Sequence, residues 1–240
     1  MSAECVITPQ RTGGDPVLPP FGLLFITPSD ARQAIGTVLA AGGRRHFLFH
    51  SGLAVTAKND LFVAGPAVGA PLAVLCLEKL IACGARHIVQ VGWAGGLQKG
   101  MAVGDLVIPS SAVSEEGTSR HYPLVQPPTA DPALCQHLAS LARTLAMPVR
   151  QGPVWTTDAP YRETWEAVRR YRRQGILAVE MEFAALLTVA AFRAISLAAV
   201  LLISDLLADD TWRPGLRDRT FHERRQLLIA QLLRYRPPSC

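Results

Sequence analysis

Short apolar runs alternate with segments of helical periodicity along most of this 240-residue chain, and this alternation is its most constraining feature. Strands are predicted at residues 88–92, 106–109, 149–155 and 197–204, after a first apolar run at 21–26. Helices are predicted at 69–83, 132–146, 162–174, 182–194 and 221–235. Such alternation is typical of the α/β class, in which helices cover a sheet.

The chain is long and apolar enough to bury one substantial core, since 49% of its residues are hydrophobic and 18% are charged. We therefore expect a single domain over residues 1–240, with an irregular arm at 1–20. Its apolar runs are too short to cross a bilayer, and the first residues lack the pattern of a signal peptide. These features predict a soluble, cytoplasmic protein without a membrane partner.

The cysteines and the basic residues point to neither a metal nor a nucleic acid. Five scattered cysteines show no C-x-x-C pair and no histidine at zinc-ligand spacing, so we expect reduced, mostly buried thiols and no metal. The net charge of +5 comes mainly from arginine. The densest cluster, at residues 169–173, lies on a predicted helix, where a solvated face or a subunit contact is the favoured interpretation.

Three local motifs carry candidate chemistry. A glycine-rich strand exit brings backbone N–H groups close to a ligand, or simply makes a tight turn. Two carboxylates flank a methionine where a strand gives way to an apolar helix, and they either balance the helix dipole or hold sugar hydroxyls. A buried strand ends in an aspartate that either caps the next segment or transfers a proton. The motifs are Val91-Gly92-Trp93-Ala94-Gly95-Gly96, Glu180-Met181-Glu182 and Ser204-Asp205.

Together with further segments in the same order, these motifs resemble the nucleoside phosphorylase superfamily, which includes purine nucleoside and uridine phosphorylases and related nucleosidases. The resemblance runs from about residue 21 to 205. It implies a three-layer αβα fold with a twisted mixed central sheet, assembled into homo-oligomers, either dimers or hexamers. The further segments are residues 65–71, 103–109 and 156–158.

The resemblance also implies site roles by position. Glu182 would bind the ribose 2′- and 3′-hydroxyls beside Glu180, and Met181 would pack beneath the sugar. Asp205 lies where purine-specific members keep the aspartate that protonates or hydrogen-bonds the base at N7. Walls for the substrate are expected from Trp93, Ala94, Gly95, Pro160 and Tyr161.

The expected phosphate site departs from the family pattern. The Gly-Asp-Pro turn after the first strand is replaced by Pro28-Ser29-Asp30, an arginine by Gln90, and a small hydroxyl residue by Trp93. Arg32 and Gln90 remain as candidate phosphate ligands. Other arginines near predicted loops offer alternatives, and His121 is a candidate for the sugar's 5′ end; the arginines are Arg120, Arg162, Arg213 and Arg217.

The expected function is cleavage of the N-glycosidic bond of a purine-type ribonucleoside, with phosphate as co-substrate and no other cofactor. Hydrolysis by water is the alternative reaction, for which Asp30 is a candidate in place of an early glutamate. A binding protein that has lost turnover is the alternative from another class. The expected partner is a small-molecule nucleoside, with no nucleic acid.

Overall fold

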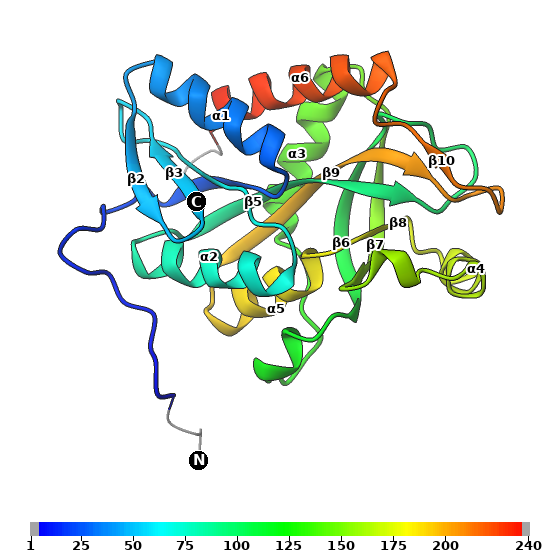
Figure 1. Cartoon of the computed structure of the whole chain (residues 1–240), viewed down its shortest axis with the longest axis horizontal. Helices are drawn as coiled ribbons and strands as arrows, with labels where there is room; N and C mark the ends of the chain where they lie inside the picture. Colours follow the sequence, from blue (N-terminus) through cyan, green and yellow to red (C-terminus); the bar gives the residue numbers. More distant parts are fainter. Residues whose placement is uncertain (1–4, 237–240) are drawn as a thin grey trace.

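The computed structural model describes residues 5–236 and contains one mixed sheet of ten strands. Its spatial order is β10-β9-β6-β7-β8-β5-β1-β4-β3-β2 (Figure 1). The strands are β1 (Phe21–Phe25), β2 (Arg44–Leu48), β3 (Ser51–Val55), β4 (Phe62–Gly65), β5 (His87–Gly96), β6 (Leu106–Glu115), β7 (Val149–Thr157), β8 (Ala178–Glu180), β9 (Ser196–Leu206) and β10 (Arg213–Pro214).

The sheet mixes parallel and antiparallel pairs, and part of it closes on itself. Strand β5 runs parallel to β1 and β9, whereas it is antiparallel to β8. Because β9 also pairs with β6, and β7 joins β6 to β8, the strands β5, β9, β6, β7 and β8 form a closed ring. This closure brings the ends of β5, β8 and β9 together.

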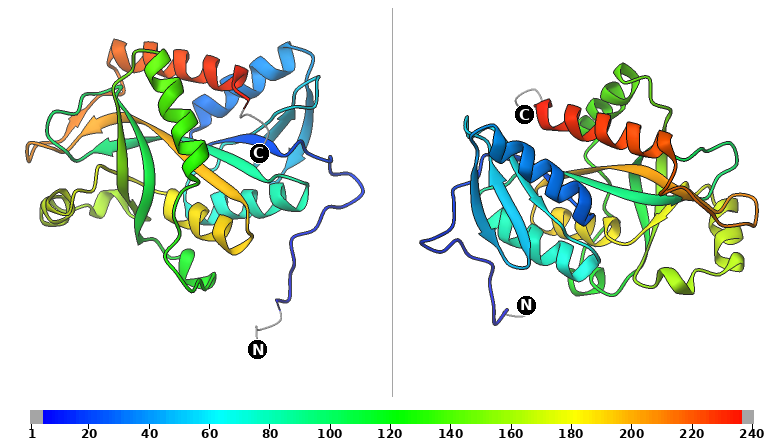
Figure 2. Two further views of the ribbon diagram at one scale, coloured as in Figure 1. Left: turned by 180° about the vertical axis from the view of Figure 1, so that it is seen from behind. Right: turned by 45° about the horizontal axis from the view of Figure 1, so that its top comes forward.

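Helices cover both faces of the sheet, which gives the expected αβα layers (Figures 1 and 2). One face carries α1, α3 and α6, and the other carries α2 and α5. The helices are α1 (Pro28–Ala40), α2 (Ala70–Ala82), α3 (Pro132–Thr144), α4 (Trp165–Arg173), α5 (Phe183–Phe192) and α6 (Arg219–Arg234). Helix α5 is apolar on every side and buried at eight of its ten positions, as expected of a helix inside a molecule.

The predicted elements are present, with shifted ends. The predicted helix at 162–174 begins only at Trp165, because Pro160–Arg162 forms a separate 3₁₀ turn and Thr164 caps the helix. Residues 206–220, for which no element was predicted, contain the short strand β10. The sequence interpretation assigned no element to α1, β2, β3, β4 or β8.

Residues 5–20 form no helix or strand, and residues 1–4 of the expected arm lie outside the described part of the chain. This segment is attached to α2: Lys79 Nζ lies 2.5 Å from Asp15 Oδ2, and the Leu18 N–H donates to the Cys83 carbonyl. The hydrogen bond from Lys79 holds the pKa of Asp15 at about 2. None of the helices between residues 5 and 236 has the length and apolarity needed to cross a membrane.

Candidate functional site

The carboxyl ends of β5 and β9 meet the short strand β8 around one glycine. Gly95 on β5 is in register with Val179 on β8 and, across the other edge, with Asp205 on β9. Ser204 is an extra residue in β9, because Ala94 pairs with Ile203 and the next position pairs with Asp205. Such a bulge re-aims the side chain that follows it.

Gly95 is required by this crowding. A Cβ atom at this position would lie 2.7 Å from the Leu207 side chain and 3.3 Å from Asp205 Oδ2. Substitution would therefore push the Asp205 carboxylate away from β5. The glycine-rich exit thus serves the close approach of two strand ends.

Glu180 is buried at the end of β8 and accepts four hydrogen bonds from the protein. Its Oε2 accepts the backbone N–H groups of Glu182 and Phe183 at 2.8 and 2.7 Å, and the Gln90 amide at 3.3 Å. Its Oε1 accepts the Thr156 hydroxyl. Burial raises the pKa of Glu180, and these donors act in the opposite direction. The Glu180 side chain therefore caps the first N–H groups of α5.

Glu182 lies at the start of α5 and reaches toward the start of α2. Its Oε1 accepts the Gly69 N–H at 2.6 Å, and the residue is only 4% exposed. Gly69 adopts φ +84°, a left-handed conformation that favours glycine. Burial and the neighbouring Glu180 charge raise the pKa of Glu182 to about 8. Because four donors favour the carboxylate form of Glu180, Glu182 is the member of the pair that more readily holds a proton, and a protonated carboxyl both donates and accepts hydrogen bonds.

Asp205 lies at the end of β9, half-buried, and both of its oxygens accept a hydrogen bond. Ser204 Oγ donates to Oδ1 at 2.6 Å, and Trp212 Nε1 donates to Oδ2 at 2.9 Å. Trp212 belongs to the loop that follows β9 and is 60% exposed. Its indole was not among the residues that the sequence interpretation selected, because no local pattern links position 212 to the strand end.

The other expected substrate walls differ in exposure. Met181 is half-buried between Glu180 and Glu182, and Ala94 is buried beside Gly95. Pro160 and Tyr161 lie in the 3₁₀ turn after β7, and Tyr161 is completely exposed. The Tyr161 ring is therefore free to contact a ligand or another molecule.

A buried cluster occupies the position where the family pattern predicts phosphate ligands. Trp93 Nε1 donates to Asp30 Oδ2 at 2.8 Å, and Arg225 of α6 contacts Asp30 Oδ1 at 2.5 Å. The Asp30 side chain is 2% exposed. Phe221 packs edge-on against the Trp93 ring, with centroids 5.2 Å apart. The carboxylate of Asp30 thus neutralises Arg225, a residue that the sequence interpretation did not single out.

The two candidate phosphate ligands lie apart from each other. Gln90 is fully buried and directs its amide toward Glu180. Arg32 is exposed and lines a hollow of about 420 Å³ at the start of α1, where Arg45 of β2 joins it. Both arginines lack hydrogen-bond and ion-pair partners among residues 5–236. Two unpaired guanidinium groups beside one hollow make it favourable for an anion.

The remaining candidates lie on the surface. Arg213 forms an ion pair with Asp209 at 2.7 Å, and the Arg120 guanidinium contacts the His121 ring. Arg162 and Arg217 are exposed, as is His121. Neither of these two contacts connects the side chains to Glu182 or Asp205.

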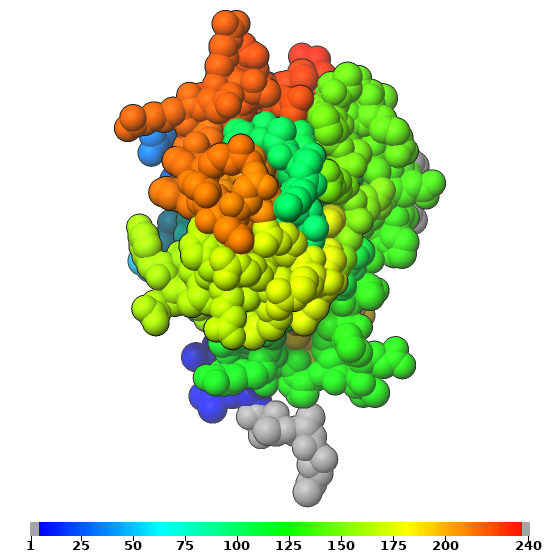
Figure 3. All heavy atoms as spheres, turned by 90° about the vertical axis from the view of Figure 1, so that its right-hand side faces the viewer, coloured from blue at the N-terminus to red at the C-terminus, as the bar shows by residue number. Residues whose placement is uncertain are grey.

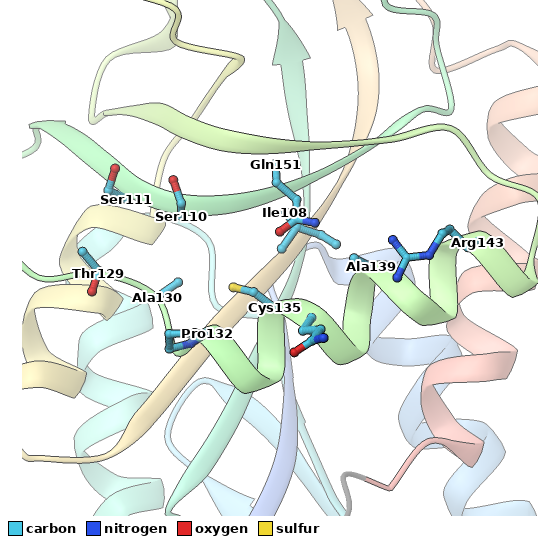
Figure 4. A pocket seen from close by; sticks show the side chains of 11 residues that line it. Ile108, Ser110, Ser111, Thr129, Ala130, Pro132, Cys135, Ala139, Arg143 and Gln151 are labelled. Carbon is cyan, nitrogen blue, oxygen red and sulfur yellow. The ribbon is translucent and has the colours of Figure 1, made fainter.

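A separate hollow lies between α3 and the strands β6 and β7 (Figure 4). Its volume is about 550 Å³, and Cys135 lies in its wall. Burial raises the pKa of the Cys135 thiol to about 11, so the thiol is protonated at neutral pH. Cys76 and Cys83 are also buried and free, whereas Cys5 is exposed; Cys240 lies outside the described residues. Residues 5–236 contain no cluster of three or more His, Cys, Asp or Glu that fits a metal ion.

Comparisons with known proteins place this arrangement in a family. The family model of the phosphorylase superfamily matches residues 28–234. A DeoD-type purine nucleoside phosphorylase from an Exiguobacterium species is 33% identical over 165 residues, which covers 67% of this chain and 70% of the relative. A guanosine phosphorylase from Halorubrum lacusprofundi is 33% identical over 133 residues, 55% of each chain.

The solved structures agree on the fold. The uridine phosphorylase from Vibrio fischeri superposes with a TM-score of 0.78 at 20% identity, covering 95% of this chain and 97% of that one. A second structure of it, complexed with 6-hydroxy-1-naphthoic acid, gives 0.77 over 90% of each chain at 22% identity. With a family model that spans most of the chain and a ringed mixed sheet shared with solved members, this chain belongs to the phosphorylase superfamily.

Proposed function

We propose that this protein cleaves the N-glycosidic bond of a purine ribonucleoside at the strand ends around Gly95. The observation that carries the proposal is the pairing of Gly95 with both β8 and β9, which brings Asp205 and the strand that leads into Glu182 to either side of one glycine. Glu182 holds the ribose hydroxyls and Met181 lies against the sugar. Asp205 contacts the base. Ala94, Pro160 and Tyr161 supply the walls.

The chemistry follows from the charges that develop as the bond breaks. The base leaves with the electron pair of the C1′–N9 bond, and a proton delivered at N7 neutralises it. The ribosyl group acquires positive charge, which nearby carboxylates stabilise. Glu182 keeps its proton because it is buried, and so it both donates to one ribose hydroxyl and accepts from the other.

We propose phosphate as the nucleophile, on the strength of the purine nucleoside and guanosine phosphorylases among the relatives. The hollow beside Arg32 and Arg45 offers an anion two guanidinium groups. Gln90 contributes by holding Glu180. Phosphorolysis predicts that base release requires phosphate and yields ribose 1-phosphate.

Hydrolysis is the second candidate, and one specific observation favours it. Asp30 places a buried negative charge beside Trp93 and already satisfies Arg225, so a phosphate dianion at that point would meet a like charge. Hydrolysis predicts base release without phosphate and yields free ribose.

The test uses the purified chain with inosine, guanosine, adenosine and uridine, with and without phosphate, and follows base and sugar products by chromatography. Release of purine bases supports the proposed bond and substrate class. Release of uracil alone contradicts the purine assignment, and saturable nucleoside binding without any product supports a binding protein. The sugar product then separates phosphorolysis from hydrolysis.

We also propose that the protein acts in the cytoplasm as a homo-oligomer. Large apolar side chains are exposed on the face formed by β2, α2 and the end of α5, which supports a contact between copies; they are Phe47, Phe49, Val68, Leu75 and Phe192. Light scattering on the eluted protein distinguishes a monomer from a dimer or hexamer.

A further inference from the structure

A second carboxyl group lies beside Asp205 at the base end of the proposed site. Glu163 stands between the 3₁₀ turn after β7 and Thr164, the N-cap of α4. It is half-buried. The sequence interpretation gave Glu163 no role.

The segments that carry Glu163 and Asp205 are fastened to each other. Leu207 packs in a buried cluster with Val168 and Tyr171 of α4. Arg172 of α4 donates to the Ala208 carbonyl. Figure 3 shows the two segments as adjoining yellow-green and orange surfaces on one side of the molecule. Two independent kinds of contact thus fix α4 against the residues that directly follow β9.

Three arginines of these segments are already paired with carboxylates other than Glu163 and Asp205. Asp210 forms ion pairs with Arg169 and Arg172, at 3.2 and 3.1 Å, and Asp209 forms one with Arg213. Arg162 and Glu166, on either side of Glu163 in the chain, are both exposed. Burial and the negative charge of Asp205 are the two influences that raise the pKa of Glu163, to about 7.

The hydrogen bonds of the two carboxyl groups differ. Both Asp205 oxygens accept a hydrogen bond, from Ser204 and Trp212. The Glu163 side chain has no hydrogen-bond or ion-pair partner among residues 5–236. Glu163 is therefore the proton-holding member of the pair, because a buried carboxyl group without hydrogen-bond donors retains its proton more readily beside a negative charge.

We propose that Glu163 is a second proton-holding residue of the base site and supplies, with Asp205, the proton that the departing purine takes up. The assignment rests on the proposed function, since it concerns the same reaction. The Glu163 O–H bond breaks, and its proton passes through the carboxyl pair to N7. The C1′–N9 bond breaks with its electrons moving into the purine, and the nucleophile forms the new bond at C1′. Solvent returns a proton to Glu163 after the base has left.

The matched test compares Glu163→Gln with Glu166→Gln, which removes the same charge from an exposed position three residues away. Each variant is assayed on inosine and on 7-methylguanosine, whose base is already cationic and needs no proton. With inosine, kcat of Glu163→Gln is expected to fall about 100-fold, the scale of general acid catalysis. With 7-methylguanosine, both variants are expected to match the unmodified protein.

The pH profile gives a second readout that a structural role would not change. With inosine, kcat of the unmodified protein is expected to decline above about pH 7, where Glu163 loses its proton, and Glu163→Gln is expected to lack that decline. Equal kcat values for Glu163→Gln and Glu166→Gln on inosine would overturn the proposal. An equal loss on both nucleosides would also overturn it, because it would mark Glu163 as structural.

Carbon NMR titration of the glutamate carboxyls separates this inference from the proposed function. A carboxyl titrating near pH 7 is expected to vanish in Glu163→Gln and to titrate at lower pH in Asp205→Asn, which removes the neighbouring charge. If Asp205→Asn leaves the titration pH of the Glu163 carboxyl unchanged, the pairing of the two groups is wrong even when the enzyme is active. An intact pairing in a protein that releases no base from either nucleoside would overturn both Glu163's role and the proposed function.

Discussion

Breaking the ion pair between Arg225 and Asp30 tests how the buried cluster around Trp93 is held together. Replacing Arg225 with methionine leaves the Asp30 carboxylate, 2% exposed, without its cation. Removing one partner of a buried pair costs about 3–5 kcal/mol. Because Ser29 and Trp93 still donate to Asp30 and Arg225 is itself 14% exposed, we expect the lower end, about 3 kcal/mol.

For a chain of this length, 1 kcal/mol shifts the melting temperature by about 2–4 °C, so Arg225→Met is expected to lower it by roughly 6–12 °C. Urea denaturation followed by tryptophan fluorescence measures the free energy of unfolding directly. The double variant Asp30→Asn/Arg225→Met is expected to recover most of the loss, since no buried charge then remains unpaired.

Arg219→Met is the matched control, because it removes an arginine of the same helix whose ion pair with Glu223 is exposed. We expect no measurable change in the free energy of unfolding from it. If Arg225→Met changes the free energy of unfolding no more than Arg219→Met does, the buried Asp30 carboxylate does not need Arg225 as its cation. The argument that the two residues neutralise each other in a buried cluster is then wrong.

Three further predictions concern the sugar and anion sides of the site. Glu182→Ala is expected to weaken nucleoside binding at least tenfold, measured by calorimetry, and unchanged affinity would remove Glu182 from the sugar site. Because the folded protein holds a proton on Glu182 up to about pH 8 whereas the unfolded chain releases it near pH 4.5, the free energy of unfolding is expected to fall as pH rises through this window. Glu182→Gln should flatten that fall in urea titrations, and parallel profiles would contradict it. Trp93→Ser opens space beside Asp30 and adds a hydroxyl donor, so phosphate should stimulate base release more strongly than in the unmodified protein; an unchanged response to phosphate would show that Trp93 does not limit anion access.

The parts of the fold that the sequence predicted are those with strong apolar patterns. Strand β9 is a continuous apolar run, and α5 is apolar throughout, so both were expected at nearly their observed positions. Helix α1 was not assigned, because much of its buried face consists of alanine and includes Asp30. Strand β2 has exposed Arg44 and Arg45 and lacks a clear alternation, so its pairing with β3 decides its structure.

The candidate site divides in the same way. Neighbouring residues on one motif, such as Glu180 and Glu182, were recognised, but only the hydrogen bonds distinguish Glu180, which caps α5, from Glu182, which we propose contacts the ribose. The contact between Asp30 and Arg225 joins residues 195 positions apart, so no local sequence pattern predicts it. Glu163 and Trp212 acquire their proximity to Asp205 through packing of α4 and of the loop after β9, which periodicity does not reveal.

The central claim is that Asp205 and Glu182 make a purine nucleoside site, and kcat/KM for inosine and uridine, measured for the unmodified protein and Asp205→Asn, tests it most directly. The account predicts that the unmodified protein prefers inosine and that Asp205→Asn lowers kcat for inosine by roughly 100-fold or more with little change in nucleoside affinity, since the carboxyl group that passes the proton to N7 is lost. Equal activity of Asp205→Asn on inosine, or a preference of the unmodified protein for uridine, would contradict it.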